Sequence, residues 1–183
     1  MAYFYFDFKD TDKQNRRNLI LSLLSQLSAR SDLCCDMLYS VYLTHNNGAQ
    51  KPTDDVLIQN LKEVLIFSDQ SPIFLIMDAI DECPNTFGLP SPRELVLDLV
   101  KELVRLSLPN LHLCVTSRPE IDIRTALEPL TPRQVSLHDQ TGQKKDIVEY
   151  VRSAVHSDAM MGIWRDEDQN MIIETLSDRA DGM

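Results

Sequence analysis

The sequence is poor in glycine. Only five glycines occur among its 183 residues, and none of them is followed by lysine. A Gly-x-x-x-x-Gly-Lys-Ser/Thr loop uses its backbone N–H groups and its lysine to hold the β and γ phosphates of a nucleotide. These residues contain no such loop, so a nucleotide site built around one is excluded within this chain.

Basic residues, paired cysteines and long apolar runs are scarce as well. The chain has 18 lysines and arginines against 28 aspartates and glutamates, a net charge of −10. Non-specific binding to nucleic acid or to anionic membranes needs a basic face, so both are disfavoured. The four cysteines show no C-x-x-C spacing, which argues against zinc, and no apolar run approaches the ~20 residues of a membrane helix. We therefore expect a cytoplasmic protein whose partners are proteins.

An acidic cluster follows a short apolar run. Ile73 to Met77 are all apolar and lead directly into Asp78, with Asp81 and Glu82 close behind. Such a run is typical of a parallel strand that is buried on both faces. Open α/β sheets bind ligands at the carboxyl ends of their strands, where a carboxylate can hold hydrated Mg²⁺ and a second acid can orient water. An aspartate at this position also caps turns in many proteins, so that simpler role stays open for Asp78.

An arginine follows a second predicted strand. Residues 111–115 are largely apolar and are followed by Thr116-Ser117-Arg118-Pro119. Arg118 is therefore expected at the same edge of the sheet as Asp78, and its planar, permanently charged guanidinium suits a terminal phosphate. A structural arginine paired with Asp81, Glu82 or Glu120 is the alternative.

Helices alternate with these strands along the chain. Thr11 and Gln14 predict a capping box for a first helix, and further helices are expected over 32–42 and after Pro52. Ser91, Pro92 and Glu94 mark a clear helix start, and the predicted last strand lies near 133–138, before helices near 143–156 and 166–180. This alternation predicts an α/β fold with a parallel sheet.

Four segments together resemble a known family. The chain is similar to NACHT-type domains of the STAND class of P-loop NTPases, and especially to the nephrocystin-3-like N-terminal domains of fungal NLR-like proteins. The segments that carry the resemblance are Ala2–Phe8, Leu75–Glu82, Val115–Glu120, and Val135–Asp139 with the later Asp146-Ile147.

The resemblance implies a fold and a division of the chain. The fold would be a three-layer α/β structure with a parallel sheet of the P-loop NTPase type. It would lack the family's first strand and P-loop, and it would carry a C-terminal helical extension. Residues 1–140 would then be a partial NTPase core and residues 141–183 a helical lid or connector.

The resemblance also implies roles for four residues. Asp78 would hold Mg²⁺ through water, as the family's first strand-end acid does. Asp81 and Glu82 would orient the hydrolytic water as catalytic residues, and Arg118 would sense the γ-phosphate of ATP or GTP.

The function expected on this basis is part of a nucleotide-dependent signalling switch, with little or no NTPase activity of its own. The protein partner expected is a second copy of the chain or an intact NACHT relative. One alternative function is a non-enzymatic module that acts on an intact NACHT protein, with Met160, Met161 and Trp164 as contacts. Another is an unrelated Mg²⁺-dependent phosphohydrolase that uses the acids at 78, 81 and 82.

Overall fold

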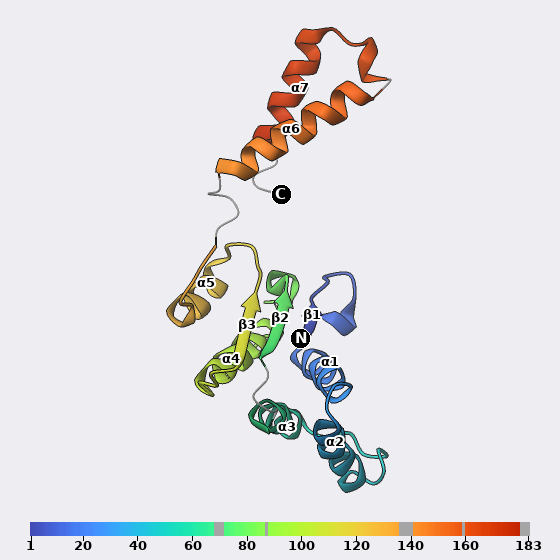
Figure 1. Ribbon diagram of the computed structural model, residues 1–183, viewed down its shortest axis with the longest axis vertical. Helices are drawn as coiled ribbons and strands as arrows, with labels where there is room; N and C mark the ends of the chain where they lie inside the picture. Colours follow the sequence, from blue (N-terminus) through green and yellow to red (C-terminus); the bar gives the residue numbers. More distant parts are fainter. Residues whose placement is uncertain (68–71, 87, 136–140, 159, 180–183) are drawn as a thin grey trace. The chain divides into compact units, whose positions relative to one another are not determined.

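The computed structural model describes residues 1–67, 72–86, 88–135, 141–158 and 160–179 (Figure 1). Internal contacts divide the chain into two compact units, Met1–Thr131 and Pro132–Met183. The first unit contains the sheet and both segments from which the sequence predicts a site, and the second unit is helical.

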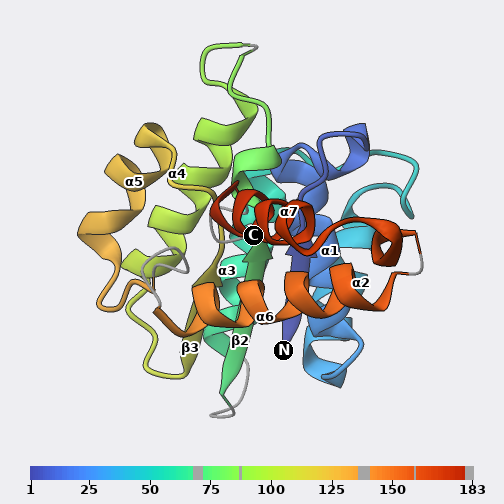
Figure 2. The ribbon, with the colours of Figure 1, turned by 90° about the horizontal axis from the view of Figure 1, so that it is seen from above.

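The first unit is built on three parallel strands. They are β1 (Ala2–Tyr5), β2 (Ile73–Asp78) and β3 (Leu111–Val115), and β2 lies in the middle (Figures 1 and 2). Tyr5 pairs with Asp78 and Met77 pairs with Val115, so the carboxyl ends of all three strands meet at one edge. The α/β class and the parallel sheet that the sequence predicts are confirmed.

Helices connect the strands, as parallel pairing requires. The α-helices of this unit are α1 (Arg16–Ser28), α2 (Asp32–Thr44), α3 (Asp54–Phe67), α4 (Pro92–Arg105) and α5 (Ile121–Leu127). Short 3-10 turns lie at η1 (Thr11–Lys13), η2 (Ile80–Glu82) and η3 (Glu128–Leu130).

The caps explain where two of these helices begin. Ser91 caps α4 in a full capping box with Glu94, as the sequence predicts. The box expected from Thr11 and Gln14 is wrong: Thr11 belongs to η1, and Asn15 instead caps α1 by accepting from the Asn18 N–H. An asparagine is as good an N-cap as threonine, so spacing alone did not distinguish the two starts.

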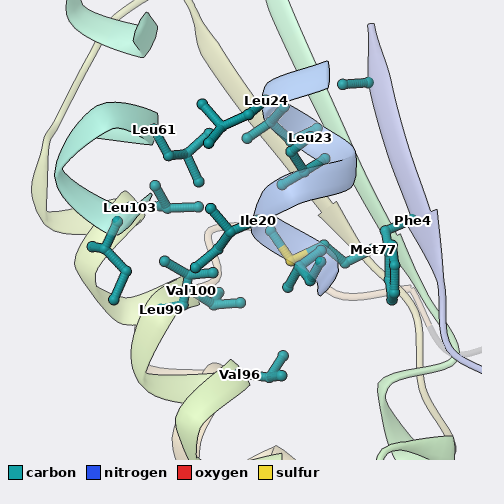
Figure 3. Close-up of a cluster of buried hydrophobic side chains, with 14 of the residues drawn as sticks. Phe4, Ile20, Leu23, Leu24, Leu61, Met77, Val96, Leu99, Val100 and Leu103 are labelled. Atoms are coloured by element: carbon teal, nitrogen blue, oxygen red, sulfur yellow. The ribbon is translucent and has the colours of Figure 1, made fainter. Parts of the chain in front are cut away.

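The core lies between one face of the sheet and helices α1, α3 and α4. Figure 3 shows side chains from all of these elements meeting around Ile20 and Met77, which are fully buried. Truncating such a residue to alanine costs about 2–5 kcal/mol, because it leaves a cavity as well as removing buried apolar surface. This packing fixes the strand ends that carry the predicted site residues.

The opposite face of the sheet is exposed in the first unit. Tyr3, Tyr5 and Phe74 are about half exposed, and Phe74 has 48% of its surface accessible. The expectation that residues 73–77 are buried on both faces is therefore wrong. An unbroken apolar run is found in strands that are covered on both faces. It also fits a strand such as this one, whose second face is apolar but exposed, so the run alone does not separate the two cases.

The second unit contains a helical hairpin. Helices α6 (Thr141–Ser157) and α7 (Asp166–Arg179) lie side by side, joined through the 3-10 turn η4 (Met161–Ile163) (Figures 1 and 2). Val155 and Ile173 are its buried apolar residues in the described part, and the two helices match the predicted ones. No helix in the described part of the chain is long and apolar enough to span a membrane.

The predicted strand near 133–138 is not formed at its described end. Residues 133–135 have no strand pairing, and Leu137, with the rest of that segment, lies outside the described residues. The apolar residues Val135 and Leu137 predicted this strand, whereas a strand forms only where a neighbouring strand offers backbone hydrogen bonds.

The four thiols test this packing. Cys34 and Cys83 are buried, whereas Cys35 and Cys114 are exposed. Burial raises the pKa of the Cys83 thiol to about 12, although the charge of Arg93 acts in the opposite sense. At pH 8 Cys83 is therefore a protonated thiol, and the thiolate is the reactive form.

We expect a thiol reagent at pH 8 to modify Cys35 and Cys114 rapidly in the folded protein, and Cys34 and Cys83 only after denaturation. Mass mapping of the modified peptides over time measures this. Replacing Cys35 with serine should remove one fast site and leave the slow ones unchanged. Rapid labelling of Cys83 in the folded chain would contradict the packing.

Candidate functional site

The acidic turn begins where β2 ends. Asp78 is the last residue of the strand, and its carbonyl accepts a hydrogen bond from the Phe6 N–H at 3.0 Å. Ala79 then adopts a left-handed conformation, with φ 56° and ψ 49°, before η2. This sharp reversal places Asp81 and Glu82 close to Asp78 without extending the strand.

Thr116 joins Asp78 to the end of β3. Its hydroxyl donates a hydrogen bond to Oδ1 of Asp78 and accepts one from the Ala79 N–H at 2.9 Å. The Ile80 N–H also bonds to the Thr116 carbonyl at 3.1 Å. Asp78 itself is exposed. One exposed carboxylate suits a hydrated Mg²⁺, which keeps most of its waters and takes only one or two protein carboxylates.

Asp81 joins the acidic turn to the loop after β3. Its Oδ1 accepts a hydrogen bond from the backbone N–H of Arg118 at 3.0 Å, and its Oδ2 lies 3.5 Å from Arg118 Nε. The side chain of Asp81 is only 8% exposed, whereas that of Arg118 is 74% exposed. The pairing of Arg118 with Asp81, which the sequence left open, is therefore present. The guanidinium nevertheless remains accessible to a ligand.

Glu82 joins the same turn to β1. Its Oε2 accepts a hydrogen bond from the Phe8 N–H at 3.1 Å. The two acids that the sequence marks as catalytic thus each hold the backbone of a neighbouring segment, one on either side of β2. Their carboxylates help to build the edge of the sheet as well as lying at the site.

Sequence reasoning missed Arg93, the charged residue at the centre of these loops. It lies in the first turn of α4 and is 6% exposed. Burial alone lowers the pKa of Arg93, but its hydrogen bonds and charge interactions with Glu120 and Asp122 outweigh this and leave the pKa raised. A signal was available: Arg93 precedes the buried Val96 and Leu97 by three and four residues, which places it on the apolar face of the helix.

These groups line an open pocket of about 650 Å³. Phe8 from the β1 loop, the acidic turn and the loop after β3 all contribute to its lining. Of the predicted site residues, Asp81, Glu82 and Arg118 line the pocket, together with Arg93 and Glu120. Asp78 is outside the lining, and its carboxylate accepts a hydrogen bond from Thr116, which lies two residues before Arg118. The described residues contain no group of three or more His, Cys, Asp or Glu side chains arranged to hold a metal directly.

Comparison with known protein families identifies the family of this chain. The family described as nephrocystin 3, N-terminal, matches residues 1–118, which include β1, β2, β3 and every predicted site residue. The chain belongs to this family. The matched residues include the strand ends and the acidic turn, and the helical second unit lies outside them. Comparisons with curated proteins and with solved structures gave no match.

The left-handed turn at Ala79 gives a testable consequence for stability. A Cβ atom in this conformation costs roughly 1–2 kcal/mol, and glycine avoids that cost while making the unfolded chain more flexible by about 0.5–1 kcal/mol. We expect Ala79→Gly to raise the free energy of unfolding by up to about 1 kcal/mol in urea titrations. Ala126→Gly, in the helical conformation of α5, should lower it by about 1 kcal/mol. Equal losses in both variants would contradict the strain at Ala79.

Proposed function

We propose that this chain provides the Mg²⁺-binding and γ-phosphate-sensing part of a nucleotide-dependent switch of the NACHT type, within the STAND class of P-loop NTPases. The observation that carries the proposal is the meeting of Asp78, Asp81 and Arg118 at adjacent parallel strand ends. Parallel α/β sheets bind ligands at that edge. The strand order β1-β2-β3 agrees with one side of the P-loop NTPase sheet.

Each residue has a distinct role in this proposal. Asp78, oriented by Thr116, holds hydrated Mg²⁺, which neutralises charge on the phosphates when bound. Asp81 and Glu82 orient the attacking water, and the exposed guanidinium of Arg118 contacts the terminal phosphate of ATP or GTP. Asp81 already pairs with Arg118, so a phosphate would compete with this carboxylate for the guanidinium.

The proposal also limits what this chain does alone. The loop and lysine that hold the β and γ phosphates are missing from these 183 residues. Phosphoryl transfer depends on loop, lysine and metal together, so we infer weak binding and little or no turnover. We place this switch in the cytoplasm, because its four cysteines are free thiols, as is usual in a reducing compartment.

Nucleotide titration tests this role. We expect MgATP and MgGTP to bind with a dissociation constant of about 1 mM or weaker, equivalent to about −4 kcal/mol. The measurement is the change in backbone amide shifts, which should be largest at Asp78, Thr116 and Arg118. Arg118→Ala should weaken the response to the triphosphate, and Asp78→Asn should abolish its dependence on Mg²⁺.

Arg124→Ala is the matched control, because Arg124 is also exposed and also pairs with a carboxylate, that of Glu128. It should leave the titration unchanged. The nucleotide site would be refuted if no shift changes appeared at about 10 mM nucleotide, tenfold above the expected dissociation constant. Equal shift changes in all three variants would refute it as well. Micromolar affinity would refute the claim that the chain lacks most of the binding groups.

The exposed apolar surface favours a second candidate function, a non-enzymatic module that binds an intact NACHT protein. The sheet face of the first unit exposes Tyr3, Tyr5 and Phe74. In the second unit, Met160 and Trp164 are also exposed. Aromatic and methionine side chains are enriched in protein interfaces.

Co-purification with an intact NACHT protein tests this second function. Binding that weakens at least about fivefold in Phe74→Ser, but not in Tyr39→Ser, which removes an exposed aromatic side chain from helix α2, would support it. A protein that remains monomeric and binds no such partner would count against it.

A further inference from the structure

Arg93 connects the two loops that carry the proposed site. From the first turn of α4, its guanidinium contacts four groups. Nε donates to the Cys83 carbonyl at 2.8 Å, and one terminal nitrogen donates to the Asp81 carbonyl. The other terminal nitrogen contacts Glu120 and, at 3.2 Å, Asp122. Two acceptors therefore belong to the acidic turn after β2, and two belong to the segment after β3.

The contacts form a closed ring. Arg93 holds the backbone of Asp81, and the Asp81 carboxylate holds the backbone N–H of Arg118. The Glu120 N–H then bonds to the Arg118 carbonyl at 2.8 Å, and the Glu120 carboxylate returns to Arg93. The separation between Asp81 and Arg118 is thus set from both sides by one buried guanidinium.

Only arginine fits this position. Its donors lie in one rigid plane and reach four acceptors at once, whereas a lysine ammonium is a compact point charge. A buried charge also needs partners, and Glu120 and Asp122 supply them. The start of α4 is held in place by the capping box at Ser91, so the root of the Arg93 side chain is fixed as well.

We propose that Arg93 is the positioning residue of this site, which sets the distance between the acid at 81 and the arginine at 118. This role deepens the proposed nucleotide function and in part rests on it. It also gives the site a means of regulation: a ligand that moves Arg118 pulls on Glu120 and, through Arg93, on the acidic turn.

The test is amide hydrogen exchange, measured by NMR on the full chain for Arg93→Lys and Arg93→Met. The Arg118 amide reports the ring directly, because its acceptor is the Asp81 carboxylate. We expect it to exchange at least about tenfold faster in both variants. The amide of Leu61, in helix α3, should become faster only by the amount that the loss of global stability in each variant explains. Arg17→Met is the matched control, since Arg17 also binds one carboxylate, Asp54, and one carbonyl, Pro52.

Glu120→Ala covers the case in which the arginine variants fail to fold. Glu120 is partly exposed, and its truncation removes the acceptor that closes the ring on the other side, so the Arg118 amide should again be selectively deprotected. An unchanged Arg118 rate in folded variants, or equal acceleration of Arg118 and Leu61, would overturn the positioning role. Selective deprotection in a protein that binds no MgATP or MgGTP would uphold the ring and refute the nucleotide function separately.

Discussion

Parallel pairing of β2 with both of its neighbours is the constraint on which the rest of the structure depends. Because all three strands run in the same direction, their carboxyl ends meet at one edge. Asp78 and Arg118 are 40 residues apart in sequence order, yet the hydroxyl of Thr116 and the carboxylate of Asp81 connect their segments directly. Helices α1, α3 and α4 pack against one face of the same strands and so hold this edge in place.

The acids at this edge hold the backbone of neighbouring segments, and this use competes with the role proposed for them at a nucleotide. Asp81 and Glu82 each accept a backbone hydrogen bond from a neighbouring segment, which stabilises the edge before any ligand binds. Carboxylates placed close together repel one another unless donors or cations are near. Backbone N–H groups, the Thr116 hydroxyl and the side chain of Arg118 meet this need here. A nucleotide with Mg²⁺ would therefore enter a site whose charges are already partly compensated.

Local signals in the sequence predicted most of the first unit. The apolar runs at 73–77 and 111–115, and the helix start at Ser91, were found because propensity, capping and packing agree there. The predicted start of helix α1 failed because Thr11 and Asn15 are nearly equal in free energy as N-cap residues. The predictions also failed where burial on the second face of β2 was inferred from apolar composition, although Phe74 remains half exposed.

The sequence alone determined the chemistry that is available: three carboxylates after one strand, an arginine after another, and no phosphate-binding loop among these residues. Residue type and order are sufficient to identify these groups, since the apolar runs in the sequence show where the strands end. Only the tertiary structure decided which group each charge contacts. Arg93 sits in a helix, and its partners Glu120 and Asp122 lie nearly 30 residues further along the chain. Long-range partners depend on how helix α4 packs against the sheet, and no local pattern in the sequence records that geometry.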